Sequence, residues 1–515
     1  MNLLPRLQLA GAGLLAMPEP AHEGFIAGGW EAAHDMGRWW DAALRLEATI
    51  GFAIPRETET TARRNLARLT DNPDRLLCNR PDIACLQPKA KLNPHNFRET
   101  LLAYNALIRW RQDPDARAAA LTLVAAMDRA LQPDGRLDCT RFGLSQLVPF
   151  TQDPSHAPGP AHAWFDSTGT SGRALEALVW LYEATGEPTV LALATRIAEH
   201  HLQATVNPDG TVRNEITAPH NVGHNHSYLG TLRGLLLFGL LTGRREFVTT
   251  VAATYRRGVR GIIVKESGWT PHDLGKTRFP NPHGDPVADP ASAGDSAQIA
   301  LWLALRTGAD DLLDDVERLV RARLLPTQLT DEEIARNPAQ GFKARDRGAW
   351  RIHGECHAEK GCTPDVHAAV IHTLCDIRQN VCSATPGGVR VNLHFDTDND
   401  WLRLTCHRDT SARVRVELKR TTPLAIRLPG WASATGAQLT LNNRPQPLQQ
   451  AGVFVQAGTK ALPAGSVVEL TFDLPGRTSE EQMPSGRTYR FTWRGDEITG
   501  IAPQDQPVPF YPAAG

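Results

Sequence analysis

The apolar residues between about Trp30 and Gln379 recur every three or four positions, a spacing that places them on one face of an α-helix. This pattern predicts helices in four clearly periodic stretches, at 98–110, 174–184, 229–243 and 296–308. Three of these helices share a Thr-Gly ending, at 185–186, 242–243 and 307–308. Glycine is the residue that most often follows the end of a helix, so these positions predict helix ends.

A second helical pattern follows each of these endings, as in the stretch 189–199. Repeated helix pairs of roughly 50 residues are typical of a solenoid or a closed toroid. We therefore expect residues 1–384 to form a six-hairpin α/α toroid, with its loops gathered over one end.

After Pro386 the apolar positions recur every second residue, which predicts β-strands with one buried and one exposed face. The alternating stretches are 389–395, 401–406, 412–418 and 467–472. Gly, Pro and Asn turns separate them, so we expect a C-terminal antiparallel β-sandwich over residues 385–515. The predicted boundary lies near 384–388, at Ala-Thr-Pro-Gly-Gly.

Composition narrows the classes of function. A chain of 515 residues is too long for one ordinary core, which agrees with two domains. Its 55 basic and 56 acidic residues give no reason to expect nucleic acid or a membrane as a partner. Eight irregularly spaced cysteines indicate reduced thiols. Pro5 and Arg6 interrupt the opening apolar stretch, and no run is long enough to span a membrane, so we expect a cytoplasmic protein, with export as the alternative.

The stretch 353–367, HGECHAEKGCTPDVH, concentrates candidate chemistry, and three interpretations of it stay open. It could bind zinc through four of its residues, Cys356, His357, Cys362 and Glu355. The spacing from Cys356 to Cys362 is wider than in structural zinc sites. It could instead be a metal-free catalytic loop that uses Glu355 or Glu359 as an acid or base, or a polar loop without catalytic chemistry.

The residues 424–432, LAIRLPGWA, resemble the LRIPGWA strand of the β-L-arabinofuranosidases of glycoside hydrolase family 127. The residues 439–443 resemble the VNG turn of that family, and 391–394 resemble its VNLY strand. In the helical part, 171–177 and 181–186 are similar to its GHLIEA…YYEATG helix. The resemblance implies an α/α toroid with a β-sandwich, and an oligosaccharide substrate. Family members often pair through their β domains, so it also allows a homodimer.

The family holds zinc with a Glu and three cysteines, from an E-T-C helix start and a C-C-P-P-N loop, and one cysteine is the nucleophile. The matching positions here are 294–296, Gly-Asp-Ser, and 361–365, Gly-Cys-Thr-Pro-Asp. Gly361 therefore stands at the nucleophile, and only Cys362 remains as a thiol. We expect acid/base carboxylates, rather than a zinc-bound thiolate, to carry the catalysis, with no cofactor required and zinc as the alternative.

The predicted catalytic residues are Glu355, Asp273 and Cys362, and Asp273 lies near the place of the family's acid/base Glu. The predicted substrate-binding residues are Asp166, Arg173, His224, His226, Asp295 and Trp164. The aspartates could equally be turn or helix-cap residues, and the histidines could be structural. The leading hypothesis is an exo-acting glycoside hydrolase with its pocket over the toroid. A lyase or epimerase acting on a uronic sugar, or a non-catalytic sugar-binding protein, are the alternatives.

Overall fold

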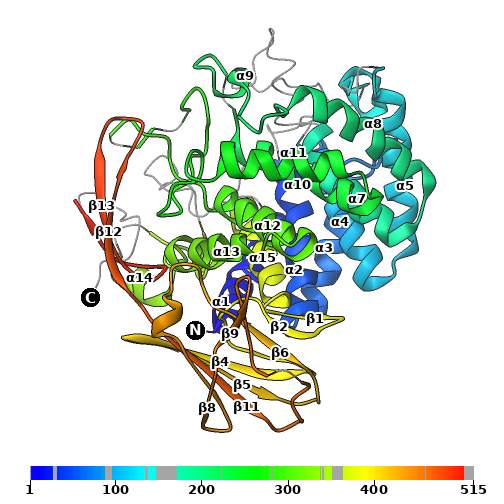
Figure 1. Cartoon of the computed structure of the whole chain (residues 1–515). Coiled ribbons are helices and arrows are strands. Elements are labelled where there is room, and N and C mark those ends of the chain that lie inside the picture. Colours follow the sequence, from blue (N-terminus) through cyan, green and yellow to red (C-terminus); the bar gives the residue numbers. More distant parts are fainter. Residues whose placement is uncertain are drawn as a thin grey trace. The chain divides into compact units, whose positions relative to one another are not determined.

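A computed structural model describes most of the chain. The described residues are 2–26, 32–86, 95–133, 137–146, 171–221, 223–278, 280–281, 283–336, 338, 341–350, 364–458 and 460–503. Long helices occupy the described chain up to Gln379 and strands follow (Figure 1). The first strand begins at Cys382, before Pro386, after which the change of period predicts strands. No described helix has both the length and the apolar character that crossing a membrane requires.

The long helices alternate between two kinds. The first kind comprises α2 (Ala32–Ile50), α4 (Asn96–Arg111), α7 (Ser171–Thr185), α10 (Asn225–Thr242), α12 (Pro290–Thr307) and α15 (Pro364–Gln379). The second kind comprises α1 (Leu3–Leu15), α3 (Arg56–Leu69), α5 (Pro114–Ala130), α8 (Pro188–Ala204), α11 (Arg245–Thr254) and α13 (Leu313–Leu319). Two short helices, α9 (Asn214–Thr217) and α14 (Asp331–Arg336), lie in connections. This alternation confirms the predicted α/α toroid.

Burial separates an inner from an outer layer of helices. Every residue from Asn96 to Leu107 in α4 is buried, and so is every residue from Ser171 to Leu181 in α7. By contrast, α8 buries only one stripe, spaced three and four residues apart. A helix buried all round must be surrounded by protein, so α2, α4, α7 and α10 form the inner layer, with α3, α5, α8 and α11 outside.

The predicted helix ends are confirmed. Helices α7, α10 and α12 end at Thr185, Thr242 and Thr307, each directly before its glycine. Those glycines, Gly186, Gly243 and Gly308, have φ angles of 68°, 72° and 79°, a left-handed conformation that side chains with a Cβ rarely adopt.

The strands form three sheets. The first has the order β1 (Cys382–Thr385), β2 (Gly388–Val391), β6 (Leu424–Arg427), β10 (Phe454–Gln456), β9 (Gln449–Ala451). The second has the order β3 (Thr397–Asp398), β4 (Leu402–Arg408), β5 (Ser411–Leu418), β11 (Val467–Asp473), β7 (Gln438–Leu441), β8 (Arg444–Gln446). The third joins β12 (Gly476–Gln482), β13 (Thr488–Arg494) and β14 (Glu497–Ala502).

The pairing within these sheets is antiparallel except between β2 and β6, which run parallel. Strand β5 buries Ala412, Val414, Val416 and Leu418 and exposes the residues between them, which confirms the predicted alternation. The strand predicted over 389–395 is shorter than expected, because its ladder ends at Val391.

Contacts divide the chain into two compact units. One comprises Met1–Gln8, Ala300–Thr327 and Thr373–Gly515, and the other comprises Leu9–Ile299 and Gln328–His372. Within the first unit, the buried Arg427 of β6 pairs with Asp314 and lies 2.7 Å from a carboxylate oxygen of Glu317, both on α13. The domain boundary near residue 384 stays a prediction.

The inner helices approach closely at one glycine, which gives a testable prediction. A Cβ at Gly37 in α2 would come within 2.2 Å of the Glu99 carbonyl oxygen in α4. Gly37→Ala should therefore lower the free energy of unfolding by about 1–3 kcal/mol, although alanine favours helix by about 1 kcal/mol. Gly230→Ala in α10 is the matched control, since its nearest heavy atom would be 3.8 Å away. Equal urea stability of the two variants would contradict the close approach.

Candidate functional site

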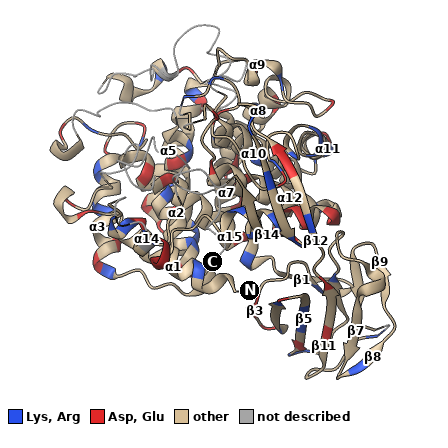
Figure 2. Cartoon of the chain, turned by 90° about the vertical axis from the view of Figure 1, so that its left-hand side faces the viewer, with Lys and Arg blue, Asp and Glu red and all other residues tan. Residues whose placement is uncertain are grey.

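Charged side chains are buried on the inner helices, near the ends at which these helices begin. Figure 2 marks the acidic and basic positions along the ribbon. They comprise His34 and Arg38 on α2, Arg98 and Glu99 on α4, Arg173 and Glu176 on α7, His226 and Arg233 on α10, and Asp295 on α12. Buried ions are costly unless they are paired, and clusters of perturbed ionisable groups are typical of functional sites. The helix starts therefore define the candidate site.

Glu99 is the centre of this network and has no exposed surface. Its Oε1 accepts hydrogen bonds from Arg173 Nη2 at 2.6 Å and Arg98 Nη1 at 3.2 Å, and its Oε2 lies 3.1 Å from Arg38 Nε. Burial alone would raise the pKa of Glu99, but the three arginines hold it well below its usual range. Glu99 is therefore an anion that joins three helices, and it has no proton to give to a substrate.

A second layer of ion pairs lies on the same helices. Arg98 Nε donates to Glu176 at 2.5 Å, and Arg233 bridges Glu176 at 3.0 Å and Asp295 at 2.6 Å. Arg38, Arg98 and Arg233 also line a cavity just large enough for one water molecule. A sugar ring does not fit in that cavity.

Both ring nitrogens of His226 are bonded to protein. Arg38 Nη2 donates to Nε2 at 2.7 Å, so Nε2 is the acceptor and the proton resides on Nδ1, 2.5 Å from Asp295 Oδ2. Burial, with Arg38 and Arg173 nearby, lowers the pKa of His226 well below its usual value, and burial raises the pKa of Asp295. His226 and Asp295 thus connect α2, α10 and α12, and their predicted contact with substrate stays a prediction.

The second ring nitrogen of His224 has no hydrogen-bond partner among the described residues. The Nδ1 atom of His224 lies 2.8 Å from Ser227 Oγ, which also accepts from Arg173 Nη1 at 3.2 Å. The Ser227 hydroxyl proton has no other acceptor among the described residues, so it goes to Nδ1 and leaves the ring proton on Nε2. Burial lowers the pKa of His224 well below its usual value, which keeps the ring neutral. An Nε2–H group of this kind can donate to a sugar hydroxyl, as the sequence predicts for this residue.

Four imidazole rings follow one another across the helix starts. The ring centroids of His34 and His95 are 6.3 Å apart, those of His95 and His224 are stacked at 5.8 Å, and those of His224 and His272 are 4.8 Å apart. The rings come from α2, from the residue before α4, from the residue before α10 and from the loop before α12. Only His224 of these was predicted as a site residue.

Asp273 lies next to this row, in a loop held against the start of α10. The backbone N–H of Asn225 donates to the His272 carbonyl at 3.0 Å, which fixes that loop. The Asp273 carboxylate accepts hydrogen bonds from Arg278 Nη2 at 2.8 Å and pairs with His272 Nδ1 at 2.7 Å. Burial would raise the pKa of Asp273, but His272 and Arg278 hold it below its usual range. The residue is therefore an anion whose predicted catalytic role stays a prediction.

Seven of the candidate site residues lie outside the described residues, namely Trp164, Asp166, Glu355, Cys356, His357, Glu359 and Cys362. The structure therefore brings together five predicted residues, Arg173, His224, His226, Asp273 and Asp295. The remaining predicted residues lie outside the part of the chain that the structure describes. Their catalytic, substrate-binding and zinc-binding roles stay predictions.

In the described part of the resembling family's zinc position, residues 294–296, the side chains are engaged with other groups. Asp295 is already bound to Arg233 and His226, and the hydroxyl of Ser296 donates to the Ser292 carbonyl at 3.0 Å. The arginines nearby would repel a divalent cation. In the part of the chain that the structure describes, no three His, Cys, Asp or Glu residues gather in a way that could hold a metal ion.

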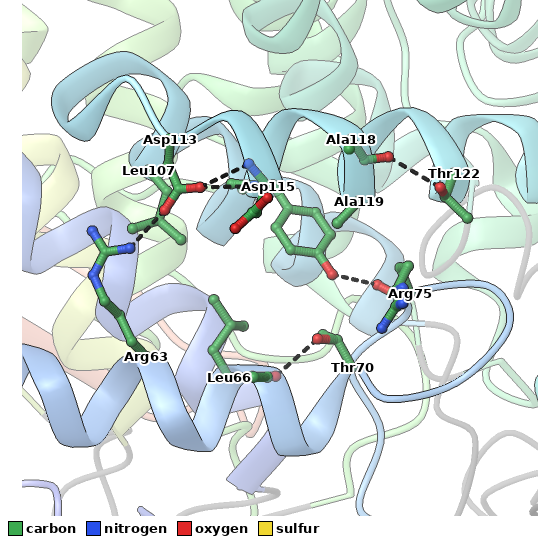
Figure 3. A pocket seen from close by; sticks show the side chains of 13 residues that line it. Arg63, Leu66, Thr70, Arg75, Leu107, Asp113, Asp115, Ala118, Ala119 and Thr122 are labelled. Carbon is green, nitrogen blue, oxygen red and sulfur yellow. Dashed lines mark hydrogen bonds and ion pairs between the residues drawn. The ribbon is translucent and has the colours of Figure 1, made fainter.

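A groove elsewhere in the helical unit lacks this chemistry (Figure 3). It lies between α3, α4 and α5, and its polar groups mostly bond to each other or to backbone. Arg63 donates to Asp113 at 2.6 Å, and Tyr104 donates to the Arg75 carbonyl at 2.7 Å (Figure 3). The groove therefore presents no buried polar cluster for catalysis.

The fold is that of the glycoside hydrolases that join an α/α toroid to β-sheets. The β-arabinofuranosidase BT3674 of family 127 is similar with a TM-score of 0.59 and 14% identity, over 96% of this chain and 81% of that one. The β-L-arabinofuranosidase Ara127N of family 127, from Geobacillus stearothermophilus T6, is similar with a TM-score of 0.54 and 14% identity, over 91% and 76%.

A third solved structure, described as a glycoside hydrolase, is similar with a TM-score of 0.58 and 14% identity, over 97% of this chain and 80% of that one. No family model and no curated protein sequence matches the chain. These likenesses confirm the fold that the sequence resemblance implies.

The ion network predicts a large loss of stability when its centre is neutralised. Glu99→Gln removes the charge that pairs with three buried arginines, so it should lower the free energy of unfolding by about 3–5 kcal/mol. Glu246→Gln is the control, because Glu246 pairs with Arg244 at 2.7 Å on the surface, and it should cost less than about 1 kcal/mol. Urea unfolding measures both, and a loss below about 1 kcal/mol for Glu99→Gln would disprove the central role.

The buried histidines predict a loss of stability in acid. Burial lowers the pKa of His34 to about 3, against the opposing effect of Glu99. Between pH 6.5 and 3 the unfolded chain binds a proton that folded His34 does not, so stability falls as pH falls, by about 1.4 kcal/mol per unit. The slope of unfolding free energy against pH should be smaller by that amount in His34→Gln. The variant of the exposed His220, His220→Gln, should keep the wild-type slope.

Proposed function

We propose that the chain is a glycoside hydrolase, exo-acting on an oligosaccharide that binds at the starts of the inner helices. The observation that carries the proposal is the row of buried imidazoles and carboxylates at that end of a toroid whose fold is shared with β-arabinofuranosidases. Neutral imidazoles exchange hydrogen bonds with sugar hydroxyls, and carboxylates supply the acid and base that cleavage of a glycosidic bond needs.

The proposed chemistry uses carboxylates, with Glu355 and Asp273 as the predicted pair. Gly361 in place of a nucleophilic cysteine and Ser296 in place of a zinc ligand both favour this over a thiolate mechanism. Arabinofuranosides are the first substrates to test, because the similar structures are arabinofuranosidases. The proposal also includes a cytoplasmic location and pairing of two copies through the β domains.

Incubation with a panel of 4-nitrophenyl furanosides, pyranosides and glucuronides tests this function. We expect release of nitrophenol and free sugar from one of these glycosides, and release of reducing sugar from a polysaccharide without the ultraviolet absorbance of an unsaturated product. An unsaturated product from a uronic polysaccharide would indicate a lyase instead, and sugar binding without any turnover would indicate a binding protein.

Glu355→Gln should abolish turnover of an oligosaccharide while circular dichroism and the thermal midpoint stay those of the wild type. A sugar leaving group needs a proton, and the amide cannot supply it. Rates like those of the wild type in this variant would remove Glu355 from the mechanism.

A further inference from the structure

A chain of hydrogen bonds runs from the buried Glu99 to the imidazole of His224. Arg173 Nη2 donates to Glu99 Oε1 at 2.6 Å, and Arg173 Nη1 donates to Ser227 Oγ at 3.2 Å. Ser227 Oγ lies 2.8 Å from His224 Nδ1. Arg173 is 1% exposed and Ser227 has no exposed surface, so bulk water does not compete for these contacts. The chain therefore fixes the His224 ring from its Nδ1 side.

Each link of this chain has a direction. A guanidinium only donates, so the Ser227 oxygen accepts from Arg173 and its own proton is left for His224 Nδ1. A neutral imidazole that accepts at Nδ1 carries its proton on Nε2. Burial, with His272 and Arg278 nearby, lowers the pKa of His224 well below its usual value, so the ring stays neutral. The charge of Glu99 is thus linked, through two donors in series, to the position of one ring proton.

His224 differs from the other rings of the imidazole row in its access to solvent. His224 is partly exposed, whereas His34, His95 and His272 are 1%, 4% and 6% exposed. Next to the row, both ring nitrogens of His226 are bonded to protein. The Nε2–H group of His224, which no described residue accepts from, therefore belongs to the one ring of the row that is partly exposed.

We infer that Ser227 is a positioning residue, which together with Arg173 makes His224 a fixed hydrogen-bond donor to an oxygen of the bound sugar. This role rests on the proposed hydrolase function. The group that Nε2–H meets is one with a lone pair, a hydroxyl or ring oxygen of the sugar. Without the Ser227 hydroxyl the ring can place its proton on Nδ1 instead, and Nε2 then accepts where it should donate.

The same contacts also join α7 to α10, so a change in stability does not by itself identify the role. The chain offers a matched control in a second buried pair of serine and histidine. Ser171 Oγ lies 2.8 Å from His201 Nε2, and neither residue has exposed surface. His201 belongs to the outer helix α8 and bonds to Thr205 through its Nδ1. Ser171→Ala and Ser227→Ala therefore both remove a buried bond between serine and histidine, and only Ser227→Ala removes one from the imidazole row.

Nitrogen NMR of the imidazoles tests the positioning role without any substrate. The shift of a ring nitrogen shows whether it carries a proton, and His224→Gln identifies the signals of this ring in protein with labelled histidine. In the wild type at neutral pH, His224 should carry its proton on Nε2. Ser227→Ala should move proton population to Nδ1, whereas Ser227→Thr, which keeps a hydroxyl, and Ser171→Ala should retain the wild-type pattern. A wild-type ring protonated on Nδ1, or no change in Ser227→Ala, would overturn the role whatever the activity.

Kinetics on the glycoside that the wild type cleaves best tests the contact with the sugar, with circular dichroism to show that each variant is folded. Ser227→Ala should raise KM about 3–10-fold and leave kcat within about twofold, because a hydrogen bond to a sugar oxygen is made equally in the ground state and the transition state. Ser227→Thr and Ser171→Ala should keep the wild-type KM.

The two readouts separate this role from the hydrolase function. A moved ring proton with an unchanged KM in Ser227→Ala would overturn the contact of His224 with the sugar and leave the hydrolase function standing. A wild type that cleaves no glycoside would overturn the hydrolase function, and the nitrogen spectra would still decide whether Ser227 fixes the proton of His224.

Discussion

The starts of the inner helices are held together through Glu99, and the arrangement of the candidate site depends on that contact. Gly37 and Arg38, two neighbouring residues of α2, contact Glu99 in different ways. Gly37 lets the α2 backbone lie against the Glu99 carbonyl, and Arg38 then brings its guanidinium to the Glu99 carboxylate. The same guanidinium reaches His226 and the start of α15, so one close helix contact places groups from α2, α4, α10 and α15 within hydrogen-bond distance.

Much of the fold could be predicted because its signals are local. A threonine followed by glycine ends a helix through the geometry of the glycine itself, and Gly186, Gly243 and Gly308 adopt that geometry wherever the neighbouring helices lie. The alternation in β5 is equally local, since consecutive side chains of a strand point to opposite faces. The parallel pairing of β2 with β6 carries no such signal, because it joins residues more than thirty positions apart.

The site was harder to predict because its residues violate the usual relation between polarity and exposure. A sequence pattern normally assigns charged residues such as Arg38, Glu99 and Glu176 to the surface. These residues are instead buried among the inner helices, where they form ion pairs. The available signal was the recurrence of Arg, Glu and His at the starts of several helices. Asp365 was placed at the end of the loop that matches the family's C-C-P-P-N, whereas its position behind Pro364 puts it in the first turn of a helix. The roles of residues 351–363 could not be judged, because they lie outside the described part of the chain.

The pairing of Arg427 with Asp314 and Glu317 has a consequence for how such a chain can change over evolution. The two acids stand in the helical stretch of the sequence and the arginine stands in the strands, yet they belong to one compact unit. Exchange of the strands for another β module would leave Glu317 buried without its cation, a loss that a folded protein tolerates poorly. A recombination that keeps the protein folded must therefore transfer residues 300–327 together with the strands. The segment that is inherited as one unit then begins within the helical part of the sequence.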